Sequence, residues 1–164
     1  MICNKMARLA ELAYLDGKEA KNKMKALGYT GHKFFENDGA QCHAVWNKEE
    51  YVLAFRGTEP TEISDVLADL NAIPRGAMTH GLVHSGFRGE CDKIWDAIVE
   101  HHGKGHQEKK LWITGHSLGA AMATIMASRC HLYPDVEPVQ ELYTFGSPRV
   151  GWPEYVKSLG VTHH

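Results

Sequence analysis

The sequence lacks any long hydrophobic run. Apolar residues make up 43% of its 164 residues, but no stretch is continuously apolar over the roughly 20 residues that a membrane-spanning helix needs. Residues 1–20 are charged and follow a helical pattern, so they also lack the apolar segment of a secretory signal peptide. From these absences we expect a soluble, cytoplasmic protein, unless an unrecognised route exports it.

An excess of basic charge is absent as well. The 18 Lys and Arg residues are balanced by 20 Asp and Glu residues, which gives a net charge of -2. Nucleic-acid-binding domains normally carry a strongly basic face. We therefore predict no nucleic-acid partner.

Cysteine is scarce and is not paired in the sequence. Cys3, Cys42, Cys91 and Cys130 are widely spaced and form no CxxC motif. A disulfide framework or a zinc site is therefore not expected, and buried free thiols are the better interpretation.

Histidine, in contrast, is abundant, with 11 residues. His101, His102 and His106 fall in a polar, glycine-interrupted stretch, where a metal site is one interpretation and a solvated loop the favoured one. No carboxylate or cysteine joins them at ligand spacing. We predict no metal and no cofactor.

The chain reads as a single domain over residues 1–164 that begins with two helices. Asn4 can cap the first helix, which Gly17 breaks, and a lysine-rich second helix ends at Gly28. A further short helix is expected at Glu62–Leu70, followed by a loop around Pro74 and Gly76.

Strand-like segments follow the first two helices. They lie at His32–Glu36, Cys42–Asn47 and Tyr51–Phe55, and Asp38-Gly39 between the first two is typical of a hairpin turn. This pattern indicates antiparallel strands that feed a sheet.

The second half of the chain alternates helices with strands. An amphipathic helix at Gly86–His101 precedes a strand at Leu111–Thr114, a helix at Ser117–His131 and a strand at Val139–Phe145. A helix begins at Pro153 and a further strand near Val161. Such alternation implies crossover connections and a mostly parallel sheet. The predicted fold class is α/β.

Gly115-His116-Ser117-Leu118-Gly119 matches the pattern G-x-S-x-G. In this motif a sharp turn between a strand and a helix exposes the serine hydroxyl, and the helix N-terminus behind it presents unpaired N–H groups. Such donors stabilise an oxyanion by about 3–4 kcal/mol each in acyl transfer. The plain alternative is that Ser117 only caps the helix. A phosphate-binding loop is excluded because no Gly-Lys-Ser/Thr sequence follows.

These residues resemble the nucleophile elbow of the class 3 (fungal-type) lipases, which have the α/β-hydrolase fold. Three further segments resemble the same family in the same order: Phe55-Arg56-Gly57-Thr58, Val83-His84-Ser85-Gly86-Phe87, and Thr144-Phe145-Gly146-Ser147-Pro148-Arg149-Val150-Gly151. The resemblance extends over most of the chain.

The resemblance implies roles for particular residues. Ser117 would be the catalytic nucleophile, and Thr58 and Leu118 would donate to the oxyanion. Taken alone, Thr58 is typical of a turn or cap residue at a strand end.

The helix after Thr58 would be a lid, with one apolar face formed by Ile63, Val66, Leu67 and Leu70. A helix packed permanently on the core is an equal alternative. The resemblance also makes His84 a buried, hydrogen-bonded structural residue rather than a base.

A serine nucleophile needs a base and a third group that orients it, and in this fold an acid and then a histidine follow the serine. Downstream of Ser117 the chain offers Asp135, His131, His163 and His164. Asp135 falls in a loop directly after the nucleophile helix, and the two final histidines share one short strand with no acid after them. His116 points elsewhere in the family arrangement. We therefore expect a chain that is truncated before the triad acid and histidine.

The sequence leaves three classes of function open. The first is a carboxylic ester hydrolase acting on an acylglycerol or another lipid ester, with transient contact to a lipid surface. The second is a catalytically silent fragment or binding module. The third and least favoured is a peptidase or acyltransferase on the same fold. Nothing in the sequence indicates an oligomeric state.

Overall fold

The computed structural model describes residues 2–58, 73–134 and 136–164. In these residues a six-stranded sheet has the order β1-β2-β3-β6-β7-β8. The strands are β1 (Gly31–Asn37), β2 (Ala40–Trp46), β3 (Glu50–Phe55), β6 (Lys110–His116), β7 (Val139–Phe145) and β8 (Thr162–His163). Strands β1 to β3 pair antiparallel, whereas β3, β6, β7 and β8 pair parallel. The predicted α/β class is confirmed.

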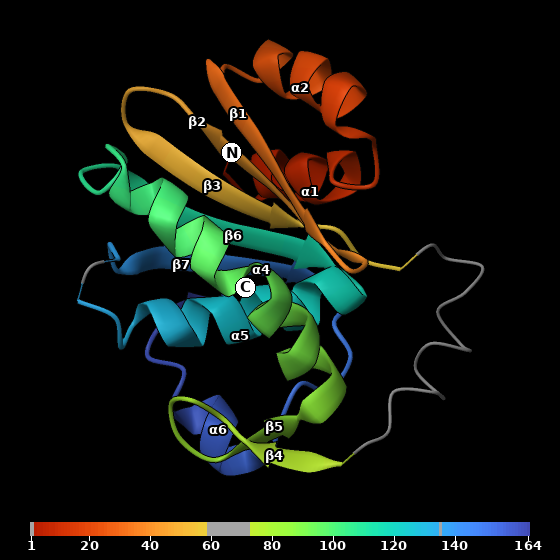
Figure 1. Ribbon diagram of the computed structural model, residues 1–164, viewed down its shortest axis with the longest axis vertical. Helices are drawn as coiled ribbons and strands as arrows, with labels where there is room; N and C mark the ends of the chain where they lie inside the picture. Colours follow the sequence, from red (N-terminus) through yellow and green to blue (C-terminus); the bar gives the residue numbers. More distant parts are fainter. Residues whose placement is uncertain (1, 59–72, 135) are drawn as a thin grey trace.

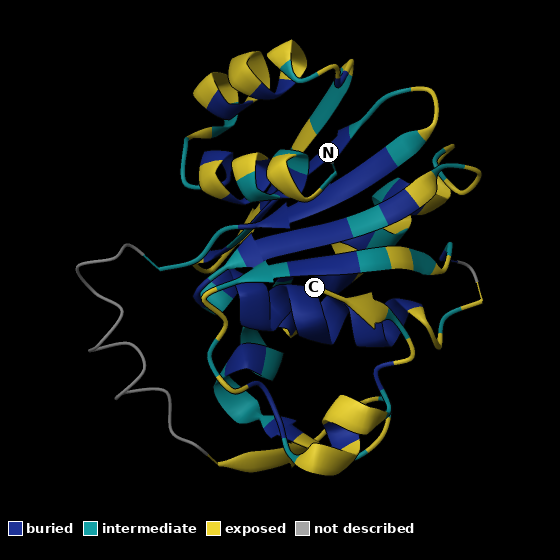
Figure 2. Cartoon of the chain, turned by 180° about the vertical axis from the view of Figure 1, so that it is seen from behind, coloured by how far each residue is buried: buried dark blue, intermediate teal, exposed yellow. Residues whose placement is uncertain are grey.

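Helices cover both faces of the sheet (Figure 1). One face carries α1 (Ile2–Leu12) and α2 (Gly17–Ala26). The opposite face carries α4 (Ser85–Gly103) and α5 (Leu118–Cys130). Each face has its own apolar core. Gly119 to Cys130 of α5 are all buried, which is visible as an almost uniformly dark helix in Figure 2. This central position explains why α5 is rich in small residues.

A smaller unit lies beyond α4 and α5. Strands β4 (Pro74–Gly76) and β5 (Leu82–His84) form an antiparallel hairpin, and α6 (Pro153–Lys157) packs against it (Figure 1). The expectation of a plain loop around Pro74 and Gly76 was wrong. Three residues per strand give too short a pattern for periodicity to detect.

The turn residues account for two further boundaries. Asp38 (φ 47°) and Gly39 (φ 84°) form the predicted hairpin turn between β1 and β2. The prediction that Asn4 caps the first helix was wrong, because α1 already begins at Ile2. The cap is at the second helix, where the Asp16 carboxylate accepts from the backbone N–H groups of Lys18 and Glu19.

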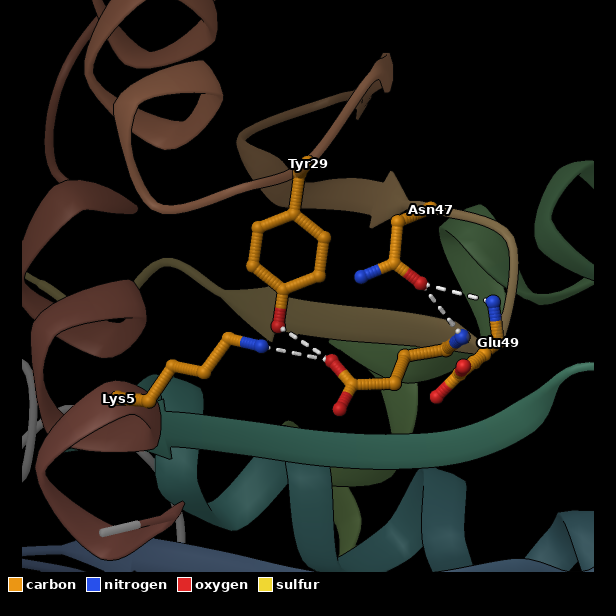
Figure 3. Close-up of polar contacts among 5 residues, drawn as sticks. Lys5, Tyr29, Asn47 and Glu49 are labelled. Atoms are coloured by element: carbon orange, nitrogen blue, oxygen red, sulfur yellow. Dashed lines mark hydrogen bonds and ion pairs between the residues drawn. The ribbon is translucent and has the colours of Figure 1, made fainter.

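The carboxylate of Glu50 links α1, through Lys5, and the segment between α2 and β1, through Tyr29, to the start of β3 (Figure 3). Its Oε2 accepts from Lys5 Nζ at 2.7 Å and from the Tyr29 hydroxyl at 3.3 Å. Asn47 shapes the preceding turn, because its Oδ1 accepts from the backbone N–H groups of Glu49 and Glu50, each at 2.9 Å. Burial and the Glu50 carboxylate raise the pKa of Tyr29 well above its usual value. The phenol therefore stays a neutral donor.

None of the helices in the described ranges combines the length and the hydropathy required to cross a membrane. In the same ranges all four cysteines are free thiols, three of them buried and Cys3 exposed.

Candidate functional site

Ser117 stands at the turn between β6 and α5. Its backbone has φ 55° and ψ -125°, a region that side chains disfavour sterically and that costs about 1–3 kcal/mol. Asp38 is the other non-glycine residue with positive φ in the described ranges, and it belongs to a hairpin turn. The Ser117 side chain makes no hydrogen bond to the first turn of α5. The plain alternative of a helix cap therefore does not explain the residue.

Two glycines allow this turn to close. A Cβ on Gly115 would lie 2.3 Å from the carbonyl oxygen of Gly119, and a Cβ on Gly119 would lie 2.3 Å from the carbonyl oxygen of Phe55. Both distances are far below van der Waals contact, so no side chain fits at either position. The amino end of α5 thus packs backbone to backbone against the ends of β6 and β3.

The segment after β3 lies beside the same turn. A Cβ on Gly57 would lie 2.3 Å from the carbonyl oxygen of His116. Thr58 and Leu118, which are both half-buried, line one cavity of about 260 Å³. The other residues that line it are Gly39, Gln41, Arg56, Gly57, Glu90 and Met122. The structure therefore brings Thr58 and Leu118 together, while their role as oxyanion donors stays a prediction.

Hydrogen bonds hold the turn from both sides. The Ser117 N–H donates to the carbonyl oxygen of Phe145 at 3.0 Å, and the Ser117 carbonyl accepts from the Ala120 N–H at 3.0 Å. Helix α5 therefore starts directly behind the serine. The N–H groups of its first turn and its positive dipole end lie there, where an anion is stabilised.

His116 is turned away from the serine and toward the opposite face of the sheet. Its Nδ1 lies 2.7 Å from the hydroxyl of Tyr14, which follows α1, and the two rings are tilted at a centroid distance of 5.8 Å. Tyr14 was not singled out from the sequence. Only the fold brings it next to residue 116, and no local pattern could have indicated the pair.

The remaining candidate histidines are engaged elsewhere. His163 Nε2 lies 2.7 Å from Thr144 Oγ1, and His164 Nε2 lies 3.2 Å from a carboxylate oxygen of Glu141. His131 caps the end of α5 and faces Gly160. Among the described residues, no imidazole hydrogen-bonds to Ser117. Asp135 lies outside these residues, as do the expected lid residues Ile63, Val66, Leu67 and Leu70.

The expectation for His84 was only partly right. Its ring packs on Phe87 at a centroid distance of 4.5 Å, and its backbone N–H donates to Val150, so the residue is structural. However, it is half-buried, and its Nδ1 has no hydrogen-bond partner among the described residues. The hydrogen bond from His84 to Val150 thus comes from its backbone, and the imidazole only packs on Phe87.

The expectation of a solvated loop at residues 101–106 was only partly right, because Lys104 and Gly105 form an exposed turn but the histidines are packed. His101 and His102 belong to α4, and together with His106 they pack around Tyr51. His102 is 2% exposed. Burial, followed by the neighbouring His106 and His101, lowers the pKa of His102 from 6.5 to about 4. In the described residues no three His, Cys, Asp or Glu side chains are grouped to hold a metal.

A family model described as Lipase (class 3) matches residues 52–163. A lipase from Rhizomucor miehei is 35% identical over 157 residues, which cover 88% of this chain and 42% of that protein. Phospholipase A1-II 1 from Oryza sativa subsp. indica is 49% identical over 56 residues, which cover 33% of this chain and 14% of that protein. The chain thus spans less than half the length of either relative.

Solved structures show the same arrangement. Lipase II from Rhizopus niveus superposes with a TM-score of 0.81 at 23% identity, over 99% of this chain and 68% of that chain. A lipase from Rhizopus microsporus var. chinensis gives a TM-score of 0.78 at 21% identity. At these identities the likeness concerns the fold.

Proposed function

Since the chain belongs to the class 3 lipase family, we propose that it carries the nucleophile of a serine carboxylic ester hydrolase. The observation that carries the proposal is the backbone of Ser117, at φ 55° and ψ -125° between β6 and α5. A strained strand-to-helix turn of this kind positions a nucleophilic serine in the G-x-S-x-G motif, whereas a structural serine has no need of it. In the described structure Ser117 is 6% exposed.

The proposed reaction begins when Ser117 Oγ attacks the ester carbonyl carbon. The carbonyl oxygen becomes an oxyanion, and the backbone N–H of Leu118, at the first position of α5, donates to it. Thr58, which lines the same cavity as Leu118, supplies the second hydrogen-bond donor to the oxyanion. The proton of the Ser117 hydroxyl passes to the leaving alkoxide, which departs as the alcohol and leaves an acyl-enzyme. Water then attacks the acyl carbon, one of its protons returns to Ser117 Oγ, and the acid is released.

We further propose a lipid ester as the substrate. The relatives from Rhizomucor miehei and Oryza sativa are a lipase and a phospholipase A1. Large apolar side chains around the β4–β5 hairpin, Ile73, Met78 and Leu82, are 60%, 44% and 41% exposed. Exposed apolar side chains of this kind support transient contact with a lipid surface.

The second candidate function is a catalytically silent binding module. The observation that favours it is that no imidazole among the described residues reaches Ser117. For the described residues alone, in which no imidazole hydrogen-bonds to Ser117, the expected turnover is weak, although oxyanion stabilisation and binding leave a residual rate enhancement over water.

A fluorophosphonate probe distinguishes the two functions. We expect covalent labelling of the folded chain that is lost in Ser117→Ala and kept in Ser147→Ala, because Ser147 is an exposed serine in the loop after β7. Intact-mass measurement of the adduct gives the readout. Absence of labelling in the folded wild-type chain supports the silent module, and equal labelling of Ser117→Ala overturns the nucleophile assignment.

The oxyanion role of the Thr58 side chain has its own test. Thr58→Val keeps the shape of the side chain but removes the hydroxyl, whereas Thr58→Ser keeps the hydroxyl. If the hydroxyl donates, the rate of labelling falls about 100-fold in the valine variant and recovers in the serine variant. An unchanged rate in Thr58→Val would leave only the backbone N–H of residue 58 as a donor.

A further inference from the structure

Strand β1 forms one edge of the six-stranded sheet and lies next to helix α2 (Figure 1). It pairs with β2 over its whole length, Gly31–Asn37, without a register shift, and it contains no proline. Proteins normally blunt such edges with short strands, bulges or proline, because an edge presents unpaired N–H and C=O groups to other chains. The regular edge of β1 is therefore a place where a further strand can add.

The hydrogen bonds of β2 show which backbone groups of β1 are left over. The Arg56 N–H donates to the carbonyl oxygen of Gln41, and the Asn47 N–H donates to that of Glu50. In an antiparallel strand the N–H and C=O groups of one residue point to the same side, and successive residues alternate. The odd-numbered residues of β2 therefore bond to β3, and the even-numbered ones bond to β1.

The register between β1 and β2 then assigns the outer edge. The even-numbered residues of β2 lie opposite the odd-numbered residues of β1, from Gly31 to Asn37. His32, Phe34 and Glu36 therefore direct their N–H and C=O groups away from β2. Within the described residues β1 has no strand neighbour on that side, so three donors and three acceptors face outward.

A groove of about 510 Å³ lies beside β1 on the side of α4. Its wall combines the apolar side chains of Phe35, Ile94 and Ala97 with the exposed Lys33. Every second side chain of an added strand points to this side of the sheet. The groove therefore has room for such side chains, and Lys33 favours a negative charge among them.

Helix α2 brings positive charge to the other side of β1. A Cβ on Gly17, at the start of α2, would lie 3.5 Å from the Phe34 side chain, so the helix begins over the strand. Burial and then the charge of Lys21 lower the pKa of His32, which agrees with a short distance between these two residues. Three exposed lysines have the i, i+3 and i+7 spacing of one helix face: Lys18, Lys21 and Lys25.

From this arrangement we infer that β1 binds an extended acidic segment of a partner protein as an additional strand of the sheet. The outward backbone groups of His32, Phe34 and Glu36 pair with the backbone of the partner. Its carboxylates meet Lys21 on one side of the sheet and Lys33 on the other. A second copy of the chain fits less well, because pairing two β1 strands brings the lysines of two α2 helices together, and lysine at an edge opposes such pairing.

Fluorescence anisotropy with a labelled peptide tests the inference on the full chain. The probe is a peptide of about eight residues in which valine and glutamate alternate, since valine favours an extended backbone. We expect saturable binding that weakens as salt is added. The same peptide with lysine in place of glutamate should not bind. Absence of binding by the glutamate peptide at low salt would contradict the inference.

Two variants at one position separate backbone pairing from charge. Glu36→Pro removes an outward N–H but no hydrogen bond to β2, so binding of the glutamate peptide should weaken about tenfold. Glu36→Gln makes the same change of charge and keeps the N–H, so it should bind at least as tightly as the wild-type chain. Equal affinities of the two variants would show that the peptide does not pair with β1.

Two further variants test the charges. Lys21→Gln should weaken binding of the glutamate peptide about threefold. Lys23→Gln removes the same charge about half a turn away on α2, where Lys23 pairs with Glu19, and it should bind as the wild-type chain does. An equal loss in both variants would mean that only the net charge of the chain attracts the peptide.

Amide hydrogen exchange gives a readout that needs no variant. The glutamate peptide should slow exchange at His32, Phe34 and Glu36 and leave Lys33, whose N–H already faces β2, unchanged. If the same protection arises without peptide as the protein concentration is raised, the occupant is a second copy. If phosphatidylserine vesicles bind the chain and the peptide does not protect these three N–H groups, the lysines serve a lipid surface. Either result would overturn the inference.

Discussion

The two ends of β3 and β6 are built in opposite ways. At their carboxyl ends, where Phe55 pairs with Gly115, the chain packs backbone against backbone through Gly57, Gly115 and Gly119. At their amino ends, where Tyr51 pairs with Leu111, large rings fill the space instead. Only the first arrangement leaves no room for a side chain between the main chains, and that is the end that carries Ser117.

The amino end is held by rings and by few hydrogen bonds. The Tyr51 hydroxyl and His101 Nδ1 lie 2.9 Å apart, while His102 meets the Tyr51 ring edge-on at a centroid distance of 5.0 Å. Neither nitrogen of His102 has a hydrogen-bond partner among the described residues. Such packing tolerates shape-conserving replacement but is sensitive to charge.

The largest effect is expected at the carboxyl ends of β3 and β6, where the glycines pack. In Gly119→Ala the new methyl group meets the Phe55 carbonyl oxygen at 2.3 Å, so we expect the free energy of unfolding to fall by about 3 kcal/mol. Fluorophosphonate labelling should fall as well. Urea unfolding followed by circular dichroism measures the loss of stability.

Gly89→Ala is the matched control, because the added methyl group in α4 meets nothing within 4 Å. Replacing a helix-interior glycine there should raise stability by about 0.5–1 kcal/mol. If Gly119→Ala were as stable as Gly89→Ala, the close approach of α5 to β3 would not be what sets the turn.

The next largest effect is the loss of stability at low pH, which we expect from the histidines packed at the amino ends of β3 and β6. The pKa of His102 in the folded chain, about 4, lies below the ordinary 6.5, so the unfolded chain binds more protons between these values. The contribution of His102 to stability is therefore complete above pH 6.5 and falls as the pH drops toward 4. The slope approaches about 1.4 kcal/mol per pH unit.

His102→Leu should flatten this acid-side slope, since it removes the titrating group without breaking a hydrogen bond. His80→Leu, at an exposed position, should leave the slope unchanged. Urea midpoints measured across this pH range give the comparison. His43, whose pKa burial also lowers to about 4, keeps part of the slope in both variants. A wild-type slope in His102→Leu would contradict the assignment.

A smaller effect is expected at the contact that directs His116 away from the serine. Tyr14→Phe removes the 2.7 Å hydrogen bond to His116 Nδ1, and we expect a loss of about 1 kcal/mol in unfolding free energy. Labelling of Ser117 should stay within a few-fold of wild type, because glycine packing rather than this bond positions the turn. A large loss of labelling with little loss of stability would show that His116 acts on the serine.

Sequence reasoning succeeded where the pattern lies within a few consecutive residues. The strand–serine–helix turn and the Asp38-Gly39 hairpin depend on a few consecutive residues, and both were predicted. The β4–β5 hairpin was missed because each strand has three residues. Asn4 was predicted to cap the first helix, which already begins at Ile2, and Asp16, which caps the second helix, was not singled out.

The sequence by itself determined the α/β alternation and the elbow motif at residues 115–119, because residue spacing and backbone preference act locally. The expectation of buried thiols was wrong for Cys3, which is exposed. Only the tertiary structure decided that Tyr14 meets His116, that three histidines pack around Tyr51, and that Arg88 and Arg129 share Asp92. These contacts join residues from different elements across the sheet or between helices. The local periodicity of a sequence does not indicate which side chains from distant segments are buried together.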